Sequence, residues 1–549
     1  MAELHTSFSG PLKKVPQVDQ VIDKYITQSR GNYDEALVTD DRWEVFYQLS
    51  DMRTGLLGWY DFPKNAQVLE LGCEFGALTG MLCDKAAHVT VVEHSMFRAH
   101  TTVKRWQDRD NLDVYVGSMF DIPFRRKFDV IVMVDSFAGL GNGSTEHAPY
   151  VEYMRFLQDF LAPQGKVLIA IDNRLGLKFF CGARDPYSGE PFGELGGGTG
   201  RGCLFSKKEL ESIFREAGFT YRKFYYPLPD FRIPQLIFTD DYLPKRDISD
   251  NFVPYDHEPD TRVLSELRLY PDIIDNGMFP MMANSFLVEC AMQEDFSQVI
   301  GATLATDRAP AYNIATCIMK DGSVVKRPLT AAAKQGIREL DENMRMLRER
   351  GIETVPFELR DGGFVMKRME LPTLSEWLTQ RTPEEGELVM QVLNRLWAAI
   401  LQSSPPAFDE DNFLLPQYPA ADWGVILKKA YINMVPENIF IDGSRLIFFN
   451  QGLTRENCPA KYQMFLAVYE SADALERIMP VKEIAKSFGI EALWDIMAME
   501  EQSFVSERRR YDVYHMFYNW ADMDPTDMMK NRQLLKIMGG DGMRAGNSD

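Results

Sequence analysis

The chain has 549 residues, of which 45% are hydrophobic and 26% charged, a composition typical of a globular protein with two or three domains. Its formal net charge of −20 disfavours a nucleic-acid substrate, because nucleic-acid binding relies on cationic side chains that neutralise phosphates. No apolar run approaches ~18 residues, so we expect no transmembrane segment, and residues 1–17 lack the apolar region of a signal peptide.

The seven cysteines are scattered through the chain and include no C-x-x-C pair. An odd, unpatterned set is typical of a reducing cytoplasm rather than of a disulfide framework or a zinc site. The histidines His88, His94 and His100 are spaced too widely to form a ligand pair on one helix. We therefore expect a cytoplasmic protein without a metal site.

The N-terminal part of the chain predicts helices. The segment WEVFYQLSDMRTGLLGWYDF (43–62) has apolar residues at helical spacing and leads directly into the first predicted strand. We expect a helical prelude over residues 1–45, packed against the domain that follows at 46–297.

The segment AQVLELGCEFGALTGMLCDKAAHVTVVE (66–93) predicts a strand, a glycine-rich turn, a helix and a second strand. The runs at 68–71 and 88–93 are short and apolar, as parallel strands buried on both faces require. Gly72 and Gly76 punctuate the turn, and glycines there let the backbone approach a nucleotide-type ligand closely.

The acidic residues of this segment indicate the charge of the ligand. Glu70 precedes the first glycine, and Glu74 lies inside the turn, where a pyrophosphate would tolerate no negative neighbour. Glu93 closes the second strand, where a carboxylate can accept hydrogen bonds from a ribose diol. The turn therefore suits a cationic ligand better than a dinucleotide.

This E-x-G-x-x-x-G turn, followed by an acid at the end of the next strand, resembles the first motif of Rossmann-like S-adenosylmethionine-dependent methyltransferases. The resemblance implies S-adenosylmethionine as cofactor, with its amino acid end at the turn and its ribose on the acid. Residues after the third strand would meet the adenine. The implied cofactor-binding residues are Glu70, Gly72, Cys73, Gly76, Glu93, Ser118, Met119 and Asp135, with Asp121 as a further candidate for the adenine.

Helices and strands continue to alternate up to residue 297. This alternation predicts an α/β fold with a doubly wound, mostly parallel sheet, which the resemblance puts at seven strands. The predicted strands are 68–71, 88–93, 113–117, 128–135, 166–172, 219–226 and an antiparallel closing strand at 284–290, and later helices are predicted at 95–107, at 147–161 and from a cap at Ser206.

Methyl transfer requires alignment, a dry site and, for a hydroxyl acceptor, a base. Three residues are candidates for the catalytic group: His147, Asp135 and Asp172. The ordinary pKa of histidine suits proton transfer near neutral pH, although His147 fits a helix-surface position equally well. Asp172 also fits the role of a loop anchor. Arg174 and Asp230 are two further candidates near the predicted strand ends.

Residues 174–205 predict an insertion, which we expect to be mobile and to lie over the site. Its glycine-rich run at 196–202 lacks the G-K-[ST] ending of a phosphate-binding loop. LELGCEFGALTG, DNRLGLKFFCGA, YPLPDFRIP and ANSFLVE together resemble a subgroup of bacterial methyltransferases that act beside glycosyltransferases in surface-polysaccharide synthesis. That resemblance spans about residues 40–295. It implies O-methylation of a small-molecule or glycan acceptor, with glycosyltransferases as candidate partners.

From 298 to 549 we expect a second, α+β and mostly helical domain. Hairpins are predicted at 312–326 and at 356–370, the latter turning at Gly362-Gly363, with a helix at 330–349 between them. The segment KAYINMVPENIFIDGSRLIFFNQG (429–452) resembles the catalytic loop and metal-binding strand of the protein-kinase-like fold.

In that resemblance Lys326 is the strand lysine, and Glu339 or Glu342 its helix partner. Asn433 stands where the catalytic aspartate belongs, and Asn450 where a metal-binding aspartate belongs. An amide cannot take a hydroxyl proton and offers no net charge to Mg²⁺. We therefore predict a degenerate kinase-like domain without phosphotransfer, and the alternative is a helical oligomerisation domain.

Three functions follow for the whole chain, whose oligomeric state the sequence leaves open. The first is an S-adenosylmethionine-dependent O-methyltransferase that acts on a sugar or glycan-related acceptor. The second is a bifunctional methyltransferase–kinase that caps a glycan chain, and the two asparagines disfavour it. The third is a non-catalytic scaffold that binds the cofactor or glycosyltransferases. Nucleic-acid methylation fits least, because Asp135-Ser136-Phe137-Ala138 replaces the N/D-P-P-Y type of motif.

Overall fold

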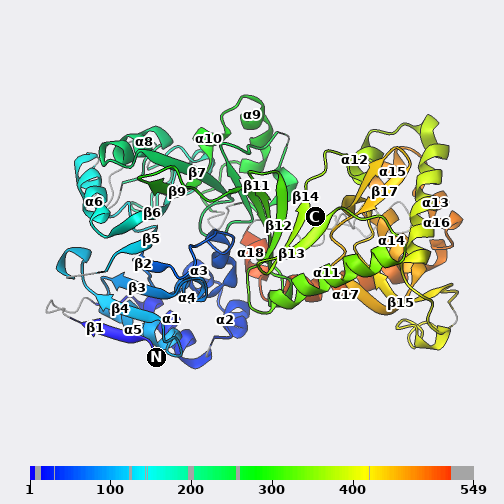
Figure 1. Cartoon of the computed structure of the whole chain (residues 1–549), viewed down its shortest axis with the longest axis horizontal. Helices are drawn as coiled ribbons and strands as arrows, with labels where there is room; N and C mark the ends of the chain where they lie inside the picture. Colours follow the sequence, from blue (N-terminus) through cyan, green and yellow to red (C-terminus); the bar gives the residue numbers. More distant parts are fainter. Residues whose placement is uncertain are drawn as a thin grey trace, which may run out of the picture. The chain divides into compact units, whose positions relative to one another are not determined.

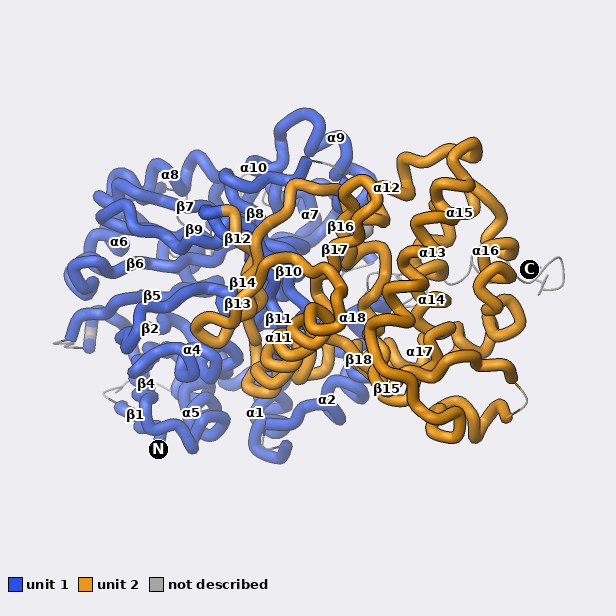
Figure 2. Tube along the Cα trace, turned by 45° about the vertical axis from the view of Figure 1, so that its right-hand side comes forward, with its two compact units in different colours: residues 1–307, 314–321, 511–523 blue, residues 308–313, 322–510, 524–549 orange. Residues whose placement is uncertain are grey.

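A computed structural model describes residues 1–6, 14–29, 31–122, 126–141, 144, 146–193, 195, 203–245, 247–254, 260–419 and 421–520. These residues divide into two compact units (Figure 2). The described part of the first unit comprises residues 1–307, 314–321 and 511–520, and that of the second comprises 308–313 and 322–510. The first unit thus continues past residue 297, where we expected the boundary.

The first unit contains a mixed sheet with the strand order β1-β4-β3-β2-β5-β6-β9-β7-β8-β10-β11 (Figure 1). The strands from β1 to β6 in this order are parallel, and β9 is antiparallel to both β6 and β7, as predicted for the closing strand. The strands are β1 (Glu3–Thr6), β2 (Gln67–Leu71), β3 (His88–Glu93), β4 (Leu112–Val116), β5 (Phe128–Val134), β6 (Leu161–Asp172), β7 (Tyr221–Leu228), β8 (Leu236–Thr239), β9 (Ser285–Ala291), β10 (Val299–Leu304) and β11 (Ile314–Met319).

Two expectations about this sheet were wrong. It has more than seven strands, because β1 extends one edge and β8, β10 and β11 extend the other. The prelude is also not purely helical, because β1 pairs in parallel with β4. The ring of His5 on β1 stacks on that of Tyr115 with centroids 4.3 Å apart, so side-chain packing reinforces the strand pairing.

Helices lie on both faces of the sheet, which explains why the parallel strands are continuously apolar. Leu69 and Leu71 of β2 belong to one core with Tyr150 and Met154 of α6 and Phe214 of α8. Val68, between the two leucines in the alternation, is buried on the opposite face. The helices are α1 (Gln17–Ser29), α2 (Asp34–Thr39), α3 (Trp43–Leu49), α4 (Thr79–Lys85), α5 (Met96–Arg105), α6 (Ala148–Gln158), α7 (Leu177–Phe180), α8 (Lys207–Glu216), α9 (Tyr270–Asp275), α10 (Phe279–Met282) and α18 (His515–Trp520), with a 3-10 helix η1 at Asp51–Leu56.

The predicted insertion at 174–205 is in part a packed segment. Helix α7 lies within it, and Leu177 and Phe179 belong to the core. The glycine-rich run at 196–202 lies outside the described residues. Ser206 caps α8 as predicted, in a capping box with Glu209.

The second unit contains a sheet of order β12-β14-β13 and the two-stranded sheets β15-β18 and β16-β17. Both predicted hairpin segments form strands, and Arg360 pairs with Gly363, which moves the second turn to Asp361-Gly362. The strands are β12 (Ser323–Pro328), β13 (Phe357–Arg360), β14 (Gly363–Lys367), β15 (Ile426–Tyr431), β16 (Ile439–Asp442), β17 (Arg445–Phe448) and β18 (Thr454–Pro459). The helices are α11 (Ala333–Glu349), α12 (Leu374–Thr379), α13 (Gly386–Ser403), α14 (Ala460–Tyr469), α15 (Ala472–Glu476), α16 (Val481–Ser487) and α17 (Trp494–Arg509).

Among the helices that the structure describes, none combines the length and the apolar character needed to cross a bilayer.

Candidate functional site

The turn after β2 depends on two glycines. Gly72 and Gly76 have φ angles of +79° and +71°, in the left-handed region that favours glycine. A Cβ on Gly72 would lie 3.1 Å from the Cβ of Ser136, and a Cβ on Gly76 would lie 2.8 Å from Cγ2 of Thr102. Cys73 is buried between them, with its Sγ 3.4 Å from Oγ1 of Thr102. The turn therefore packs closely against the end of β5 and against α5.

Two buried carboxylates hold this turn in place. Glu70 accepts a hydrogen bond from the Thr79 hydroxyl at 2.6 Å, and burial raises the pKa of Glu70 to about 7. Glu93 accepts from the backbone N–H groups of Ser95 at 2.8 Å and Glu74 at 3.1 Å. Burial also raises the pKa of Glu93. Glu70 thus anchors the start of α4, and Glu93 joins the turn to the end of β3.

Glu74 connects the turn to the N-terminal helices. It has a φ of +53°, a left-handed conformation that is uncommon for a residue with a side chain. Its carboxylate accepts from Gln48 Nε2 at 2.6 Å and from Arg53 NH1 at 3.3 Å, and it lies 3.9 Å from Arg98 NH1. The sequence indicated only the negative charge of Glu74, and the structure shows that its carboxylate joins α3 and η1 to the turn.

The residues predicted to meet the adenine follow β4, next to Glu93. The N–H of Gly117 donates to the carbonyl oxygen of Glu93 at 3.0 Å, which brings the two strand ends together. Ser118 caps the following 3-10 turn, in which Met119 is buried. The side chain of Asp121 lies outside the described residues.

Four buried charged residues form an ion-pair network beyond the ends of β6 and β7. Lys178 Nζ contacts Asp172 Oδ1 at 2.6 Å and Asp230 Oδ2 at 2.9 Å. Arg232 contacts both oxygens of Asp172, at 3.0 and 2.9 Å, and Asp230 Oδ2 at 3.0 Å. Although burial opposes ionisation, Arg232 and Lys178 hold the pKa of Asp172 below its ordinary value. Asp172 is therefore a structural anion and a poor proton acceptor.

Asp135 differs from Asp172 and Asp230 because one of its carboxylate oxygens has no hydrogen-bond partner among the described residues. It follows β5 with a φ of +58°, and its N–H donates to the carbonyl oxygen of Ala170 at 3.0 Å. Its Oδ1 is buried and has no hydrogen-bond partner among the described residues, and its Oδ2 lies 3.7 Å from Arg232 NH2. Burial raises the pKa of Asp135 to about 7. The positive charge of Arg232 acts to lower this pKa, and the negative charge of Asp172 acts to raise it.

The structure adds Tyr47, which the sequence analysis did not single out. Tyr47 lies on α3 and is 7% exposed, and its hydroxyl has no hydrogen-bond partner among the described residues. The guanidinium of Arg53 covers its ring at 3.7 Å from the centroid. Burial raises the pKa of Tyr47, and the charges that act on its hydroxyl include those of Glu74, Asp135 and Arg232.

Two further predicted residues are placed differently. His147 precedes α6, and its ring packs edge-on against Phe205 with centroids 5.9 Å apart. In the described part of the chain, no hydrogen bond or ion pair joins it to Asp135 or Asp172. Arg174 pairs with Glu209 at 2.9 Å, so it supports the capping box of α8. The structure thus links Asp135 to Asp172 through Arg232, and His147 stays a prediction.

In the second unit, the amides predicted at kinase-like positions bind one another. Asn433 Nδ2 donates to the carbonyl oxygen of Asn450 at 2.8 Å, and Asn450 Nδ2 donates to Asn438 Oδ1 at 2.9 Å. Gln451 Nε2 donates to the carbonyl oxygen of Asn433 at 2.9 Å. The loop after β15 and the turn after β17 are therefore joined by neutral hydrogen bonds.

The predicted helix partner of Lys326 is not supported. Glu339 and Glu342 both lie on the exposed face of α11, and Glu339 accepts from Gln335 at 3.0 Å. Burial, together with the charge of Arg308, lowers the pKa of Lys326 to about 8.

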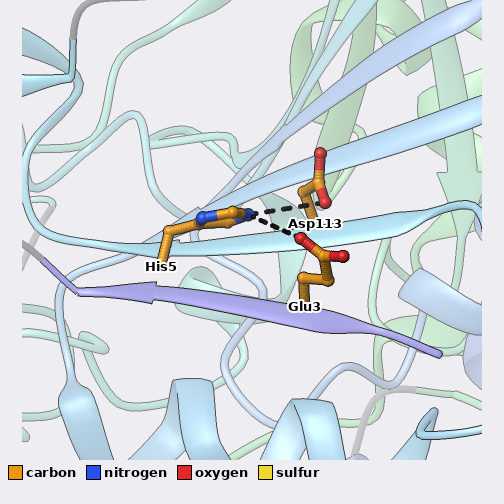
Figure 3. Close-up of side chains that lie close together, drawn as sticks. All are labelled: Glu3, His5 and Asp113. Carbon is orange, nitrogen blue, oxygen red and sulfur yellow. Dashed lines mark hydrogen bonds and ion pairs between the residues drawn. The ribbon is translucent and has the colours of Figure 1, made fainter.

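One group of side chains at the edge of the first sheet has metal-ligand chemistry: Glu3, His5 and Asp113 (Figure 3). His5 Nε2 lies 3.5 Å from Asp113 Oδ1 and 3.8 Å from Glu3 Oε2. The other oxygen of Asp113 is 3.0 Å from His88 Nε2 and 3.8 Å from Arg126 NH2, and the Glu3 side chain is 72% exposed. We interpret the group as ionic contacts that hold β1 against β4.

Part of the first unit is similar in sequence to known methyltransferases. Residues 42–223 match a family model described as a methyltransferase domain. A protein of Staphylococcus carnosus (strain TM300), named an uncharacterized methyltransferase, is 37% identical over 95 residues, which cover 17% of this chain and 42% of the relative. The chain thus spans less than half the length of this curated relative. The residues that match a methyltransferase domain therefore all lie within the first unit.

Solved structures of methyltransferases are also similar to this chain. A methyltransferase in complex with the Trm112 methyltransferase activator of Haloferax volcanii is 14% identical, with a TM-score of 0.30, covering 48% of this chain and 98% of its own. The N-methyltransferase NodS of Bradyrhizobium japonicum WM9, in complex with S-adenosyl-L-homocysteine, is 18% identical, with a TM-score of 0.21, covering 27% and 74%.

Proposed function

We propose that the protein is an S-adenosylmethionine-dependent methyltransferase that methylates a hydroxyl group of a sugar or glycan-related acceptor. The observation that carries this proposal is the buried, unpartnered Oδ1 of Asp135, at a strand end joined to the glycine-rich turn. That junction is direct, because Ser136 Oγ donates to the carbonyl oxygen of Leu71 at 2.8 Å. Asp135 would thus lie next to the turn that we propose binds the cationic cofactor.

The residues around the turn fit S-adenosylmethionine. Glu70, Glu74 and Glu93 are three acids around it, and a bound sulfonium or ammonium group would favour their ionised forms. A Cβ on Gly117 would meet no atom within 4 Å, so the chain after β4 leaves room for a ligand. Gly72, Gly76 and Cys73 would hold the amino acid end, Glu93 the ribose, and Ser118 and Met119 the adenine. When bound, the cofactor supplies an electrophilic methyl group.

Asp135 is the proposed general base. A general base works best when its pKa lies near the operating pH, and burial brings the pKa of Asp135 to about 7. Asp172 does not meet this condition, because Lys178 and Arg232 keep it ionised. The Asp172–Lys178–Asp230–Arg232 network instead sets the electrostatic surroundings of Asp135.

The acceptor class is inferred from the resemblance to methyltransferases of surface-polysaccharide synthesis, and glycosyltransferases are the partners we propose. All seven cysteines are buried thiols, which fits the cytoplasmic location that this role requires. No nucleic-acid acceptor is proposed, because the chain carries a net charge of −20.

For the second unit we propose a degenerate kinase-like domain without phosphotransfer. The hairpin β16-β17, the helix α11 and the hydrogen-bonded amides Asn433, Asn438 and Asn450 support this proposal. Neutral amides supply neither a base nor the charge that Mg²⁺ requires. The bifunctional alternative would need Mg-ATP turnover by this unit, and the scaffold alternative would need cofactor binding without methyl transfer.

The test of the proposed function is methyl transfer from labelled S-adenosylmethionine to methyl glycosides of glucose, galactose, mannose and rhamnose by the full-length protein. Transfer that Asp135→Asn abolishes, with cofactor binding retained, would support the proposal. Cofactor binding without transfer to any sugar would leave the scaffold function as the better account.

A further inference from the structure

We propose that the Tyr47 hydroxyl binds the nucleophilic atom of the acceptor and selects an oxygen rather than a nitrogen nucleophile. This inference rests on the proposed function and assigns a specificity-determining residue to the same site. It starts from two buried polar atoms that have no hydrogen-bond partner among the described residues, Tyr47 Oη and Asp135 Oδ1.

Two such atoms are costly to leave unpaired. An unsatisfied buried polar group costs about 1–3 kcal/mol, so a ligand that satisfies both groups gains that energy on binding. They come from different parts of the first unit: Tyr47 lies on α3 and Asp135 after β5. Both residues border the same turn: Tyr47 lies against Arg53, which donates to Glu74, and Ser136, next to Asp135, donates to the Leu71 carbonyl oxygen. One polar group of an acceptor bound beside this turn is proposed to meet both atoms.

Contacts that start at the proposed cofactor turn hold Tyr47 in position. Glu74 accepts hydrogen bonds from Gln48 and Arg53, and the Arg53 guanidinium lies 3.7 Å from the centroid of the Tyr47 ring. The Tyr47 hydroxyl is therefore held by contacts that begin in the turn proposed to bind the cofactor. This arrangement pre-organises the hydroxyl before the acceptor binds, which is what positioning for catalysis requires.

The hydrogen-bond capacity of the two atoms decides between oxygen and nitrogen. A hydroxyl group has one proton, which it can give to Asp135, and two lone pairs. One lone pair can accept the Tyr47 proton while the other attacks the methyl carbon. A neutral amine has a single lone pair, which must face the methyl group, and an ammonium has none. A primary amine could donate to the Tyr47 oxygen, but it would leave the Tyr47 proton unpaired. Only an oxygen nucleophile can give a proton to Asp135, accept the Tyr47 proton and keep a lone pair for attack.

The charges near Asp135 also exclude an anionic acceptor group. Two cations that act on Asp135, Lys178 and Arg232, are already paired with Asp172 and Asp230. A carboxylate or phosphate entering beside Asp135 would therefore meet another acid rather than an uncommitted base. A neutral hydroxyl avoids that repulsion.

The step balances in atoms and charge. As the acceptor oxygen forms its bond to the methyl carbon, the methyl–sulfur bond breaks and its electron pair remains on sulfur, which leaves S-adenosylhomocysteine. The hydroxyl proton passes to Asp135 Oδ1. Tyr47 donates its hydrogen bond to the acceptor oxygen throughout and is not consumed.

The test compares Tyr47→Phe with the wild-type protein in two measurements. Calorimetry gives the dissociation constant for S-adenosylmethionine, and labelled methyl transfer gives kcat/KM with the methyl glycosides above and with glucosamine and galactosamine. We expect transfer to hydroxyl groups, an alkali-stable ether product, a loss of at least tenfold in kcat/KM for Tyr47→Phe and a cofactor dissociation constant unchanged within twofold.

Tyr270→Phe is the matched control. Tyr270 is also buried with an unpartnered hydroxyl among the described residues, but the charges that act on it are those of Glu266, Cys181 and Asp230. Its substitution should leave kcat/KM unchanged.

Several results would overturn the inference. They are methyl transfer to an amino group, an equal loss in Tyr270→Phe, and cofactor binding that weakens as much as transfer in Tyr47→Phe. Cofactor binding with no transfer to any sugar would overturn it as well. If the wild-type protein bound no cofactor, the proposed function itself would fail.

Discussion

Arg232 donates two parallel hydrogen bonds to Asp172, at 3.0 and 2.9 Å, although the two residues are sixty positions apart in the chain. Such a bidentate contact fixes both the distance and the plane of the carboxylate. It keeps Asp172 ionised and leaves Asp135, whose Oδ2 is 3.7 Å from the same guanidinium, as the acid with an unpartnered oxygen. The division of roles between the two aspartates follows from this geometry.

The first prediction concerns the stability of this network. Lys178→Met leaves Asp172 and Asp230 buried with one cation instead of two, and breaking a buried pair in this way costs about 3–5 kcal/mol. The free energy of unfolding from urea titration measures this loss. Lys104→Met is the matched control: its ion pair with Asp23 is half exposed and should contribute about 1 kcal/mol at most. Equal effects of the two substitutions would contradict the buried network.

The second prediction is a pH dependence of activity. Asp135 must be deprotonated to accept a proton, so kcat/KM should rise with pH through about 7 and level off above it. Asp135→Asn should lower kcat by about 10² to 10⁴ and remove this rise, because an amide cannot act as a base. A wild-type profile that is flat between pH 5.5 and 8.5 would argue against Asp135 as the base.

The third prediction uses stability in place of activity. The folded-state pKa of Asp135 is raised, so between the unfolded value of about 4 and the folded value of about 7 the folded protein binds the extra proton. Its contribution to stability is therefore largest at low pH and is lost as the pH rises to about 7. Asp135→Asn removes the titration, so relative to wild type it should gain stability between pH 5 and pH 8. Thermal unfolding at the two pH values measures this difference, and a gain that is the same at both would be inconsistent with a raised pKa.

The fourth prediction concerns Gly80 in α4. A Cβ there would lie 2.3 Å from the Trp106 ring, so Gly80→Ala should destabilise the protein by about 1–3 kcal/mol through overpacking. In a Trp106→Leu background the same change should be neutral or stabilising, because alanine favours helices over glycine. The measurement is the free energy of unfolding, from denaturant titration, of the wild type, Gly80→Ala, Trp106→Leu and the double variant. A destabilisation that persists without Trp106 would show that some other contact requires Gly80.

The fifth prediction concerns the amides of the second unit. Asn433→Asp removes the donor to the Asn450 carbonyl oxygen and places a carboxylate against it, which should cost about 1–3 kcal/mol. The wild-type protein should show no ATPase activity with Mg²⁺. Measurable ATP hydrolysis by the wild type would support the bifunctional alternative instead.

The sequence predicted the central strands of the first unit well, because each is a short apolar run bounded by Gly, Pro or acidic residues. Glu70, Gly72, Gly76 and Glu93 could be placed at one site because parallel strands share one carboxyl edge. The added strand β1 was missed because Glu3–Thr6 is short and lies at the sheet edge, where no apolar run is required.

The side-chain partners could not be predicted, because they depend on contacts between distant segments. Arg232 and Lys178 lie in the runs YPLPDFRIP and DNRLGLKFFCGA, but nothing in those runs shows that both cations meet Asp172. The hydroxyl of Tyr47 is likewise hidden in a helical apolar pattern, which indicates only that the residue is buried. His147 was chosen for its chemistry, and the sequence did not show that its ring packs against Phe205.

The most direct test of the central claim is calorimetric titration of the full-length protein with S-adenosylmethionine, S-adenosylhomocysteine and Mg-ATP in parallel, with Glu93→Ala as the control variant. We expect both sulfur compounds to bind the wild type, to lose affinity in Glu93→Ala, and Mg-ATP to give no heat of binding. Failure of both sulfur compounds to bind the wild-type protein would contradict the assignment of the turn between Glu70 and Gly76 as a cofactor site.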